Sequence, residues 1–186
     1  AWSLFYLGEW TTLARRLPAQ VSEAEDRGDL YTATSLSSSV LTIRWLMNDD
    51  PLGGQQALDA LIKRWPRTEF HALDYWHMVA QCTMALYQQQ GETAWQQLLR
   101  DERGLKRSLL LRVQTVRVEF GELQGRCLVM RAMAATDNMQ RSRLLKQTAK
   151  IAHKLAKAAT PWSEALAAGL RAGIAATRGA ASAAAD

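Results

Sequence analysis

Apolar residues recur at helical spacing along most of the chain, and this periodicity is the strongest constraint on the fold. Leu58, Leu61, Ile62 and Trp65 follow the i, i+3, i+4, i+7 pattern that places large side chains on one face of a helix. Similar stripes run through residues 73–87 (Leu73, Trp76, Ala80, Thr83, Tyr87), 113–130 (Val113, Val116, Phe120, Leu123, Cys127, Met130) and 144–155 (Leu144, Leu145, Thr148, Ile151, Ala152, Leu155). The chain has 4 prolines and 11 glycines in 186 residues, which favours long helices over strands joined by tight turns.

Residues typical of helix ends separate these stripes. Asp50-Pro51 and Thr160-Pro161 each place a capping side chain before a proline at the first helical position. Thr136-Asp137 supplies side-chain acceptors for a following helix, and Gly91 is expected to close the helix that begins near Thr68. The predicted helices span residues 9–27 (bent at Pro18), 29–48, 51–65, 68–90, 92–106, 109–135, 137–159 and 161–178.

The spacing of the long predicted helices indicates a repeat. These helices begin near residues 29, 68, 109 and 161, so the first two periods are about 40 residues long. A period of this length with two helices is typical of an α-solenoid, in which each helical pair buries its apolar face only against its neighbours. We therefore expect an all-α fold of about four stacked helical hairpins, tetratricopeptide-like, in one domain over residues 1–186. Both ends lack a start or stop signal, which indicates a fragment of a longer chain.

Two segments fit this prediction less well. Hydroxyl side chains dominate residues 32–39, where they compete for backbone hydrogen bonds and weaken a helix. Residues 111–120 alternate apolar and polar side chains and contain three valines, which would also suit a strand. We favour a helix there because the apolar stripe continues without interruption to Met130.

Four segments resemble a known family. They are Tyr6 to Leu36 (YLGEWTTLARRLPAQVSEAEDRGDLYTATSL), Arg64 to Trp76 (RWPRTEFHALDYW), Leu86 to Leu98 (LYQQQGETAWQQL) and Arg107 to Phe120 (RSLLLRVQTVRVEF). Together they resemble the C-terminal helical-repeat region that follows the kinase domain in large bacterial eukaryotic-like serine/threonine protein kinases. The positions Tyr87, Gly91, Ala94 and Leu98 are similar to the turn between the two helices of a tetratricopeptide unit. The resemblance implies a regulatory or substrate-recruiting region with a protein partner.

Motifs for catalysis or metal binding are missing from the sequence. The kinase motifs G-x-G-x-x-G, H-R-D and D-F-G do not occur. His71 and His77 lie six residues apart, unlike the i, i+4 pair of a zinc-binding helix. The carboxylates of Asp49-Asp50 and Asp101-Glu102 are adjacent, so on a helix they diverge by about 100° and cannot face each other. We expect no catalytic, cofactor-binding or metal-binding residues and no enzymatic activity.

The net charge and the cysteine content limit the class of partner and the cellular compartment that we expect for this chain. The net charge of +5 from 23 basic and 18 acidic residues is smaller than nucleic-acid-binding domains usually carry. Cys82 and Cys127 lie too far apart for a metal knuckle and fit buried thiols in a reducing, cytoplasmic environment. No apolar run approaches the roughly 18 residues needed to span a bilayer.

The main electrostatic feature is a basic amphipathic helix over residues 139–158. Its candidate partner-binding residues are Arg141, Lys146, Lys150, His153, Lys154 and Lys157, and no acidic residue lies between Asn138 and Ser163. The face could simply be solvated, or it could bind an acidic protein segment. Nucleic acid is an unlikely partner because no aromatic residues interleave the charges.

The predicted function is a non-catalytic protein-interaction scaffold, whose partner is another protein or the rest of its own chain. A nucleic-acid or anion-binding module that uses the basic helix is the alternative, and a repeat that senses a small ligand in its groove is a third possibility. The sequence does not determine the oligomeric state.

Overall fold

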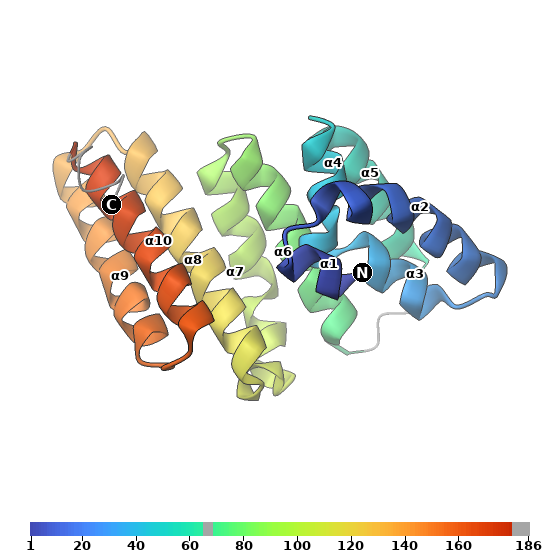
Figure 1. Cartoon of the computed structure of the whole chain (residues 1–186). Helices are drawn as coiled ribbons and strands as arrows, with labels where there is room; N and C mark the ends of the chain where they lie inside the picture. Colours follow the sequence, from blue (N-terminus) through green and yellow to red (C-terminus); the bar gives the residue numbers. More distant parts are fainter. Residues whose placement is uncertain (65–68, 180–186) are drawn as a thin grey trace.

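The computed structural model describes residues 1–64 and 69–179, which form helices joined by short turns (Figure 1). No strand occurs within these residues, so the all-α prediction is confirmed. The elements are α1 (Trp2–Tyr6), α2 (Trp10–Asp26), α3 (Leu30–Ser37), the 3-10 helix η1 (Ser39–Thr42), α4 (Ile43–Met47), α5 (Pro51–Lys63), α6 (Ala72–Tyr87), α7 (Gly91–Arg107), the 3-10 helix η2 (Leu110–Arg112), α8 (Gln114–Ala134), α9 (Asn138–Ala156) and α10 (Pro161–Thr177).

The predicted capping residues begin their helices as expected. The Asp50 carboxylate accepts a hydrogen bond from the backbone N–H of Gly53 at 2.8 Å, and Pro51 is the first residue of α5. Asp137 accepts from the backbone N–H groups of Met139 and Gln140 at the start of α9. Such side chains satisfy backbone donors that have no partner within the first turn of a helix.

The prediction of one continuous helix over residues 29–48 is wrong. The structure divides it into α3, η1 and α4, with Ser38 in an extended conformation between α3 and η1. The Ser38 hydroxyl donates a hydrogen bond to the carbonyl oxygen of Thr34 at 2.8 Å. This bond is the competition between hydroxyl groups and the helical backbone that the composition of residues 32–39 indicates.

Two other predicted boundaries change. The helix expected over 109–135 starts only at Gln114, because Leu109 has a left-handed backbone (φ 64°) and η2 follows it. The strand considered for residues 111–120 does not form. The helix expected from residue 68 begins at Ala72, and the predicted end at Trp65-Pro66 lies outside the described residues.

The predicted role of Gly91 is wrong. Helix α6 ends at Tyr87, and Gln89 takes the left-handed conformation (φ 61°) in the turn. Gly91 is instead the first residue of α7 and is buried against α8, where a Cβ atom would lie 2.6 Å from Met130 Cγ. A side chain is missing at this position because two helices approach closely there, and not because the backbone needs a glycine conformation.

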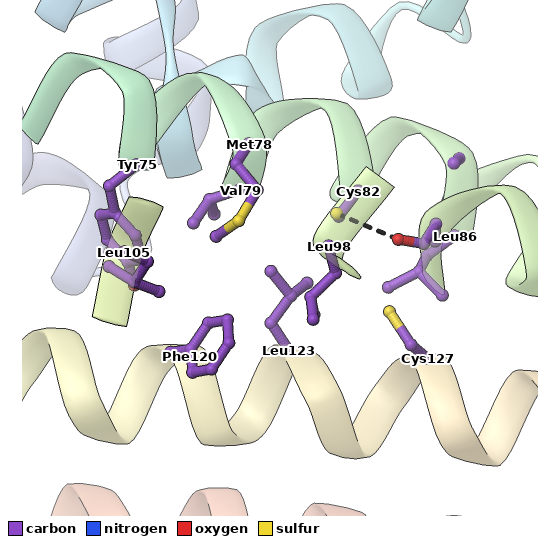
Figure 2. Packing of buried hydrophobic residues seen from close by; sticks show 12 residues of the cluster. Tyr75, Met78, Val79, Cys82, Leu86, Leu98, Leu105, Phe120, Leu123 and Cys127 are labelled. Atoms are coloured by element: carbon purple, nitrogen blue, oxygen red, sulfur yellow. Dashed lines mark hydrogen bonds between the residues drawn. The ribbon is translucent and has the colours of Figure 1, made fainter. Parts of the chain in front are cut away.

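Helix α6 is the most deeply buried helix described, and its predicted stripe is only partly right. Tyr87 is 45% exposed, whereas Tyr75, Met78 and Cys82 are buried. The three buried residues belong to one cluster with residues of α7 and α8, among them Leu98, Phe120 and Cys127 (Figure 2). A helix that is covered on nearly all sides carries apolar residues on every face, so periodicity alone cannot choose the register.

Both cysteines are buried, as predicted, and both are free thiols. The Cys82 thiol donates a hydrogen bond to the carbonyl oxygen of Ala94 at 3.3 Å (Figure 2). Burial raises the pKa of the Cys127 thiol to about 12 and that of Cys82 further still. Neither thiol is therefore ionised near neutral pH, and both act as packing residues.

Apolar contacts are divided among several local clusters along the chain. One cluster joins α2 to η1, another joins α5 to α6, a third joins α6, α7 and α8, and two more join α8, α9 and α10. Each helix thus packs mainly on its neighbours in the sequence, and helix α8 also contacts both α6 and α10. The helices follow one another from the α2–α3 end to the α9–α10 end (Figure 1).

Candidate functional site

A groove crosses the surface formed by α4, α6, α8 and α10. Its volume is about 440 Å³, and Leu86, Val129 and Leu166 contribute apolar walls from three of these helices. Glu122 and Arg126 of α8 supply charged groups within it. Apolar walls with a few polar groups are typical of binding sites in proteins.

Helix α8 brings its polar groups to this groove through helical spacing. Glu119, Glu122 and Arg126 stand at i, i+3 and i+7, so they form one row along the helix. Val129 and Met130 continue the same row and line the groove with Glu122 and Arg126, whereas Glu119 stands one turn before the lining residues. The groove therefore changes along α8 from charged to apolar.

Glu122 and Arg126 form a partly buried ion pair. Glu122 Oε1 lies 3.6 Å from Arg126 Nε, and the side chains are 21% and 42% exposed. Burial raises the pKa of the Glu122 carboxyl, and the positive charge of Arg126 offsets only part of this effect.

Glu119, the first residue of the row, is held by two tyrosine hydroxyls. Tyr6 of α1 donates to Oε1 and Tyr75 of α6 donates to Oε2, each at 3.3 Å. Burial nevertheless raises the pKa of the Glu119 carboxyl, because it outweighs the two hydrogen bonds. Helix α1 thereby reaches across α6 to α8, and the indole ring of Trp2 lies 6.2 Å from that of Trp76.

One wall of the groove contains glycines within a helix. Ala165, Gly169 and Gly173 of α10 are spaced by four residues and all line the groove. A Cβ atom on Gly173 would lie 3.2 Å from Val129, whereas one on Gly169 would meet no atom within 4 Å. Packing within the chain therefore does not explain Gly169, even though glycine in a helix costs about 1 kcal/mol relative to alanine.

The predicted basic residues lie mostly on the far side of α9 from its buried stripe. Lys146, Lys150, His153, Lys154 and Lys157 are all exposed. Lys146 and Lys150 border a surface hollow with Arg143, whereas Lys154 borders a different hollow between α8 and α9. Positive side chains in the last turn also interact favourably with the helix dipole, so part of this charge has a structural use.

Arg141, the sixth predicted residue, has a different environment. Its guanidinium donates to the carbonyl oxygens of Ala135 at 2.6 Å and Ala132 at 3.4 Å, and to Asn138 Oδ1 at 3.0 Å. The two carbonyls lie at the end of α8; that of Ala132 also accepts from the backbone N–H of Ala135 at 3.3 Å, so the 2.6 Å bond to the Ala135 carbonyl is the main contribution of Arg141. Arg141 therefore joins the end of α8 to the start of α9, and each of its three guanidinium nitrogens already donates one hydrogen bond.

Replacing Arg141 tests this structural role. We expect Arg141→Ala to lower the free energy of unfolding by about 1–3 kcal/mol, because it removes the donor that Arg141 supplies to the partly buried Ala135 carbonyl. The exposed control Lys146→Ala should change it by no more than about 0.5 kcal/mol. Urea denaturation of the two variants measures the difference, and equal losses would contradict the assignment of Arg141 to the α8–α9 junction.

The burial of Glu122 predicts a pH dependence of stability. Because its pKa is raised in the folded state, the unfolded chain releases this proton at a lower pH. The contribution of the protonated carboxyl is therefore complete below the ordinary glutamate pKa and is lost as the pH rises through the raised value. We therefore expect the free energy of unfolding of Glu122→Gln, relative to that of the unchanged chain, to increase from about pH 4 to about pH 7. Denaturation curves at both pH values measure this gain, which a constant difference would refute.

Sequence reasoning missed the row on α8. Its signal is the polar triplet at i, i+3 and i+7 beside the apolar stripe of residues 113–130. Such a triplet is usually a solvated helix face, and only the packing of α6 and α10 beside it shows that Glu122 and Arg126 line a groove.

The described part of the chain contains neither a cluster of metal-binding side chains nor a helix that could span a membrane. No group of three or more His, Cys, Asp or Glu side chains within residues 1–64 and 69–179 is placed to hold a metal ion. His71 lies at the start of α6, His77 is buried within it and His153 is exposed on α9, so the histidines are not brought together. None of the helices described combines the length and hydrophobicity needed to cross a bilayer.

The fold and the groove define the chain as an all-α protein with an open, partly charged cleft across neighbouring helices. Comparisons with known protein families, with curated proteins and with solved structures find no match.

Proposed function

We propose that the chain is a non-catalytic protein-interaction module whose groove on α4, α6, α8 and α10 binds a segment of a partner. The observation that carries this proposal is the groove itself, with apolar walls from separate helices and the ion pair of Glu122 and Arg126 on α8. Tyr87 and Gly169, which line it, are exposed, so the groove is open to a chain that lies along it.

The arrangement of contacts supports a tetratricopeptide-like solenoid as the architecture. Helix α8 contacts α6 and α10, while α7 and α9 each connect two of these three helices. In solenoids such an inner set of helices provides an extended binding surface. The resemblance of Tyr6–Leu36 and Arg107–Phe120 to kinase C-terminal regions further supports a regulatory or substrate-recruiting role beside a bacterial serine/threonine kinase domain. A reading frame that encodes such a domain in the same polypeptide would test this context.

Selection from a displayed library of random peptides tests the use of the groove. We expect peptides that bind the unchanged chain and lose binding to Gly169→Trp, because an indole ring at this open position fills the groove. Ala168→Trp is the matched control, since Ala168 is exposed on the same helix and does not line the groove. If no selected peptide distinguishes these two variants, the groove is not the binding surface.

A small ligand is a second candidate for the groove, because its volume of about 440 Å³ falls within the range of small-molecule sites. The exposure of several lining residues favours a peptide, since small ligands are usually enclosed over most of their surface. A library that yields only groove-independent peptides would leave the small ligand as the better candidate.

Anion binding by α9 is the alternative that the exposed lysines favour. Lys146 to Lys157 span about 17 Å of helix, which is a short strip beside a nucleic-acid duplex. We expect DNA to bind no more tightly than roughly 10⁻⁴–10⁻⁶ M at physiological salt, with little preference for sequence. Fluorescence anisotropy at about 0.15 M salt measures this affinity. Nanomolar DNA binding would favour an anion-binding function if it is lost when four lysines of α9 are replaced by glutamate: Lys146, Lys150, Lys154 and Lys157.

A further inference from the structure

We propose that one exposed face of α9 is a second interaction surface, which binds a short acidic segment of a partner protein with an apolar residue at one end. The residues of this α9 stripe are Met139, Arg143, Lys146 and Lys150. The inference goes beyond the proposed function, because no described residue lines both the α9 stripe and the groove on α4, α6, α8 and α10. Either surface can therefore fail its test without the other.

The α9 stripe is continuous because its residues follow helical spacing. A hollow of about 460 Å³ runs along it, bordered by Met139, Ser142, Arg143, Lys146, Gln147 and Lys150. These six residues stand at i, i+3, i+4, i+7, i+8 and i+11, so they share one face of the helix, and all are exposed. The opposite face of α9 is buried against its neighbours. The stripe therefore presents three cations and one large apolar side chain to the outside.

The cations of the α9 stripe are not compensated within the described part of the chain. Among these residues, no carboxylate forms an ion pair with Arg143, Lys146 or Lys150. On other helices a glutamate four positions earlier pairs with the cation, as it does for Lys106 on α7 and Arg126 on α8. Helix α9 contains no Asp or Glu. Like charges at helical spacing repel one another, so the stripe is a patch of uncompensated positive charge.

The helix dipole accounts for other cations of α9 but not for these. It favours positive side chains in the last turn, where His153 and Lys154 lie. Lys150 precedes that turn, and Arg143 and Lys146 lie nearer the N-terminus, where the dipole gives a cation no advantage. The local structure therefore gives no reason for three cations in succession, whereas an acidic partner would complement them.

Met139 favours a protein segment over a nucleic acid as this partner. Its side chain is 81% exposed and borders the same hollow as Arg143. A thioether adapts to apolar side chains of different shapes, whereas a phosphate backbone offers no apolar group to contact it. No aromatic side chain is among the residues that border the hollow, so bases have no surface on which to stack.

The length of the α9 stripe sets the length of the segment. From Met139 to Lys150 the helix rises about 17 Å, at about 1.5 Å per residue. An extended chain covers this distance with about five residues. The segment would therefore place one apolar residue on Met139 and a short run of carboxylates along Arg143, Lys146 and Lys150.

Fluorescence anisotropy with labelled peptides tests the charge preference. The probe is a short peptide with a leucine followed by glutamates, and its counterpart has glutamine in place of every glutamate. We expect the glutamate peptide to bind the unchanged chain at least roughly tenfold more tightly than the glutamine peptide. The difference should shrink as the salt concentration rises, because the charges are exposed. Equal binding of the two peptides would overturn the inference.

The double variant Lys146→Glu with Lys150→Glu should bind the glutamate peptide at least roughly tenfold more weakly. The matched control is Arg15→Glu with Arg16→Glu, which changes the net charge equally at exposed positions of α2, at the other end of the molecule (Figure 1). This control should keep its affinity within roughly twofold. Circular dichroism establishes that both variants are folded. An equal loss in the two variants would show that net charge alone attracts the peptide, and would refute a site on α9.

Met139→Gln tests the apolar end of the segment. Replacing the leucine of the glutamate peptide by serine should weaken its binding to the unchanged chain roughly threefold, and should have no effect on its binding to Met139→Gln. Met133→Gln is the control, since Met133 is 59% exposed on α8 and does not border the hollow. A leucine effect of the same size in both variants would contradict the contact with Met139.

Other occupants of the α9 stripe would give different results, each of which would overturn the inference. A single-stranded oligonucleotide of equal charge that binds more tightly than the peptide would assign the stripe to nucleic acid. Sedimentation with vesicles of phosphatidylcholine and phosphatidylserine, without peptide binding, would assign it to a membrane surface. Self-association that is lost in the Lys146 and Lys150 double variant would assign it to a second copy of the chain.

The groove variant Gly169→Trp separates this inference from the proposed function. It fills the groove and leaves α9 unchanged, so it should bind the glutamate peptide as the unchanged chain does. Loss of the peptide in Gly169→Trp would place it in the groove, which would support the proposed function and refute the site on α9.

Discussion

Phe120→Ala should lower the free energy of unfolding by about 3–5 kcal/mol, because it removes a large buried ring from a packed cluster. Phe120 is 6% exposed and lies among side chains of α6, α7 and α8, including Met78 and Leu105 (Figure 2). The ring belongs to α8, and the cluster joins that helix to the two preceding it. Three helices would line the cavity left behind, so no single side chain can move to fill it.

Urea denaturation followed by circular dichroism measures this loss. Lys150→Ala serves as the control, since Lys150 is exposed on α9 and its replacement should change the stability by no more than about 0.5 kcal/mol. Equal losses for the two variants would mean that the register of α8 or α9 is wrong.

Gly91→Ala should lower the free energy of unfolding by about 1–3 kcal/mol, although alanine is the better helix former. The added Cβ would lie 2.6 Å from Met130 Cγ, 2.8 Å from Met130 Cβ and 3.1 Å from the backbone nitrogen of Arg131. A change of rotamer cannot move the last two atoms, so α7 must shift away from α8. The shift would also disturb the ion pair between Glu92 and Arg131, whose atoms are 2.7 Å apart.

Gly169→Ala is the matched comparison, because a Cβ atom there meets no other atom within 4 Å. This second change should raise stability by about 0.5–1 kcal/mol through the higher helix propensity of alanine. Thermal or urea denaturation of both variants gives the signs of the two effects. A loss at Gly169 as large as that at Gly91 would contradict the open space above Gly169 in the groove.

Local sequence signals determined much of the secondary structure. Asp50-Pro51, Asp137 and Thr160-Pro161 start α5, α9 and α10 as predicted, since a capping bond depends on residues two or three positions apart. The stripe of residues 144–155 is buried in α9 apart from a half-buried Ile151. An outer helix has one buried face, and the 3.6-residue period reports that face directly.

Contacts distant in sequence decided what the local signals could not. Helix α6 is covered by several neighbours, so its stripe gave the wrong register at Tyr87. In the sequence, Arg141 is one of six similar basic residues, but in the structure its guanidinium donates to carbonyl oxygens at the end of α8. The sequence suggests that Gly91 ends a helix, but the close approach of Met130 is the reason that this position has no side chain.

The sequence by itself determined that the chain is helical, where most of its helices begin and which face of α9 is charged. Each of these properties depends on residues within one or two helical turns. Only the tertiary structure decided that Glu122 and Arg126 line a groove, because its walls come from α4, α6, α8 and α10. It also brought together Tyr6 and Glu119, which are more than a hundred positions apart, and no local pattern records such a contact.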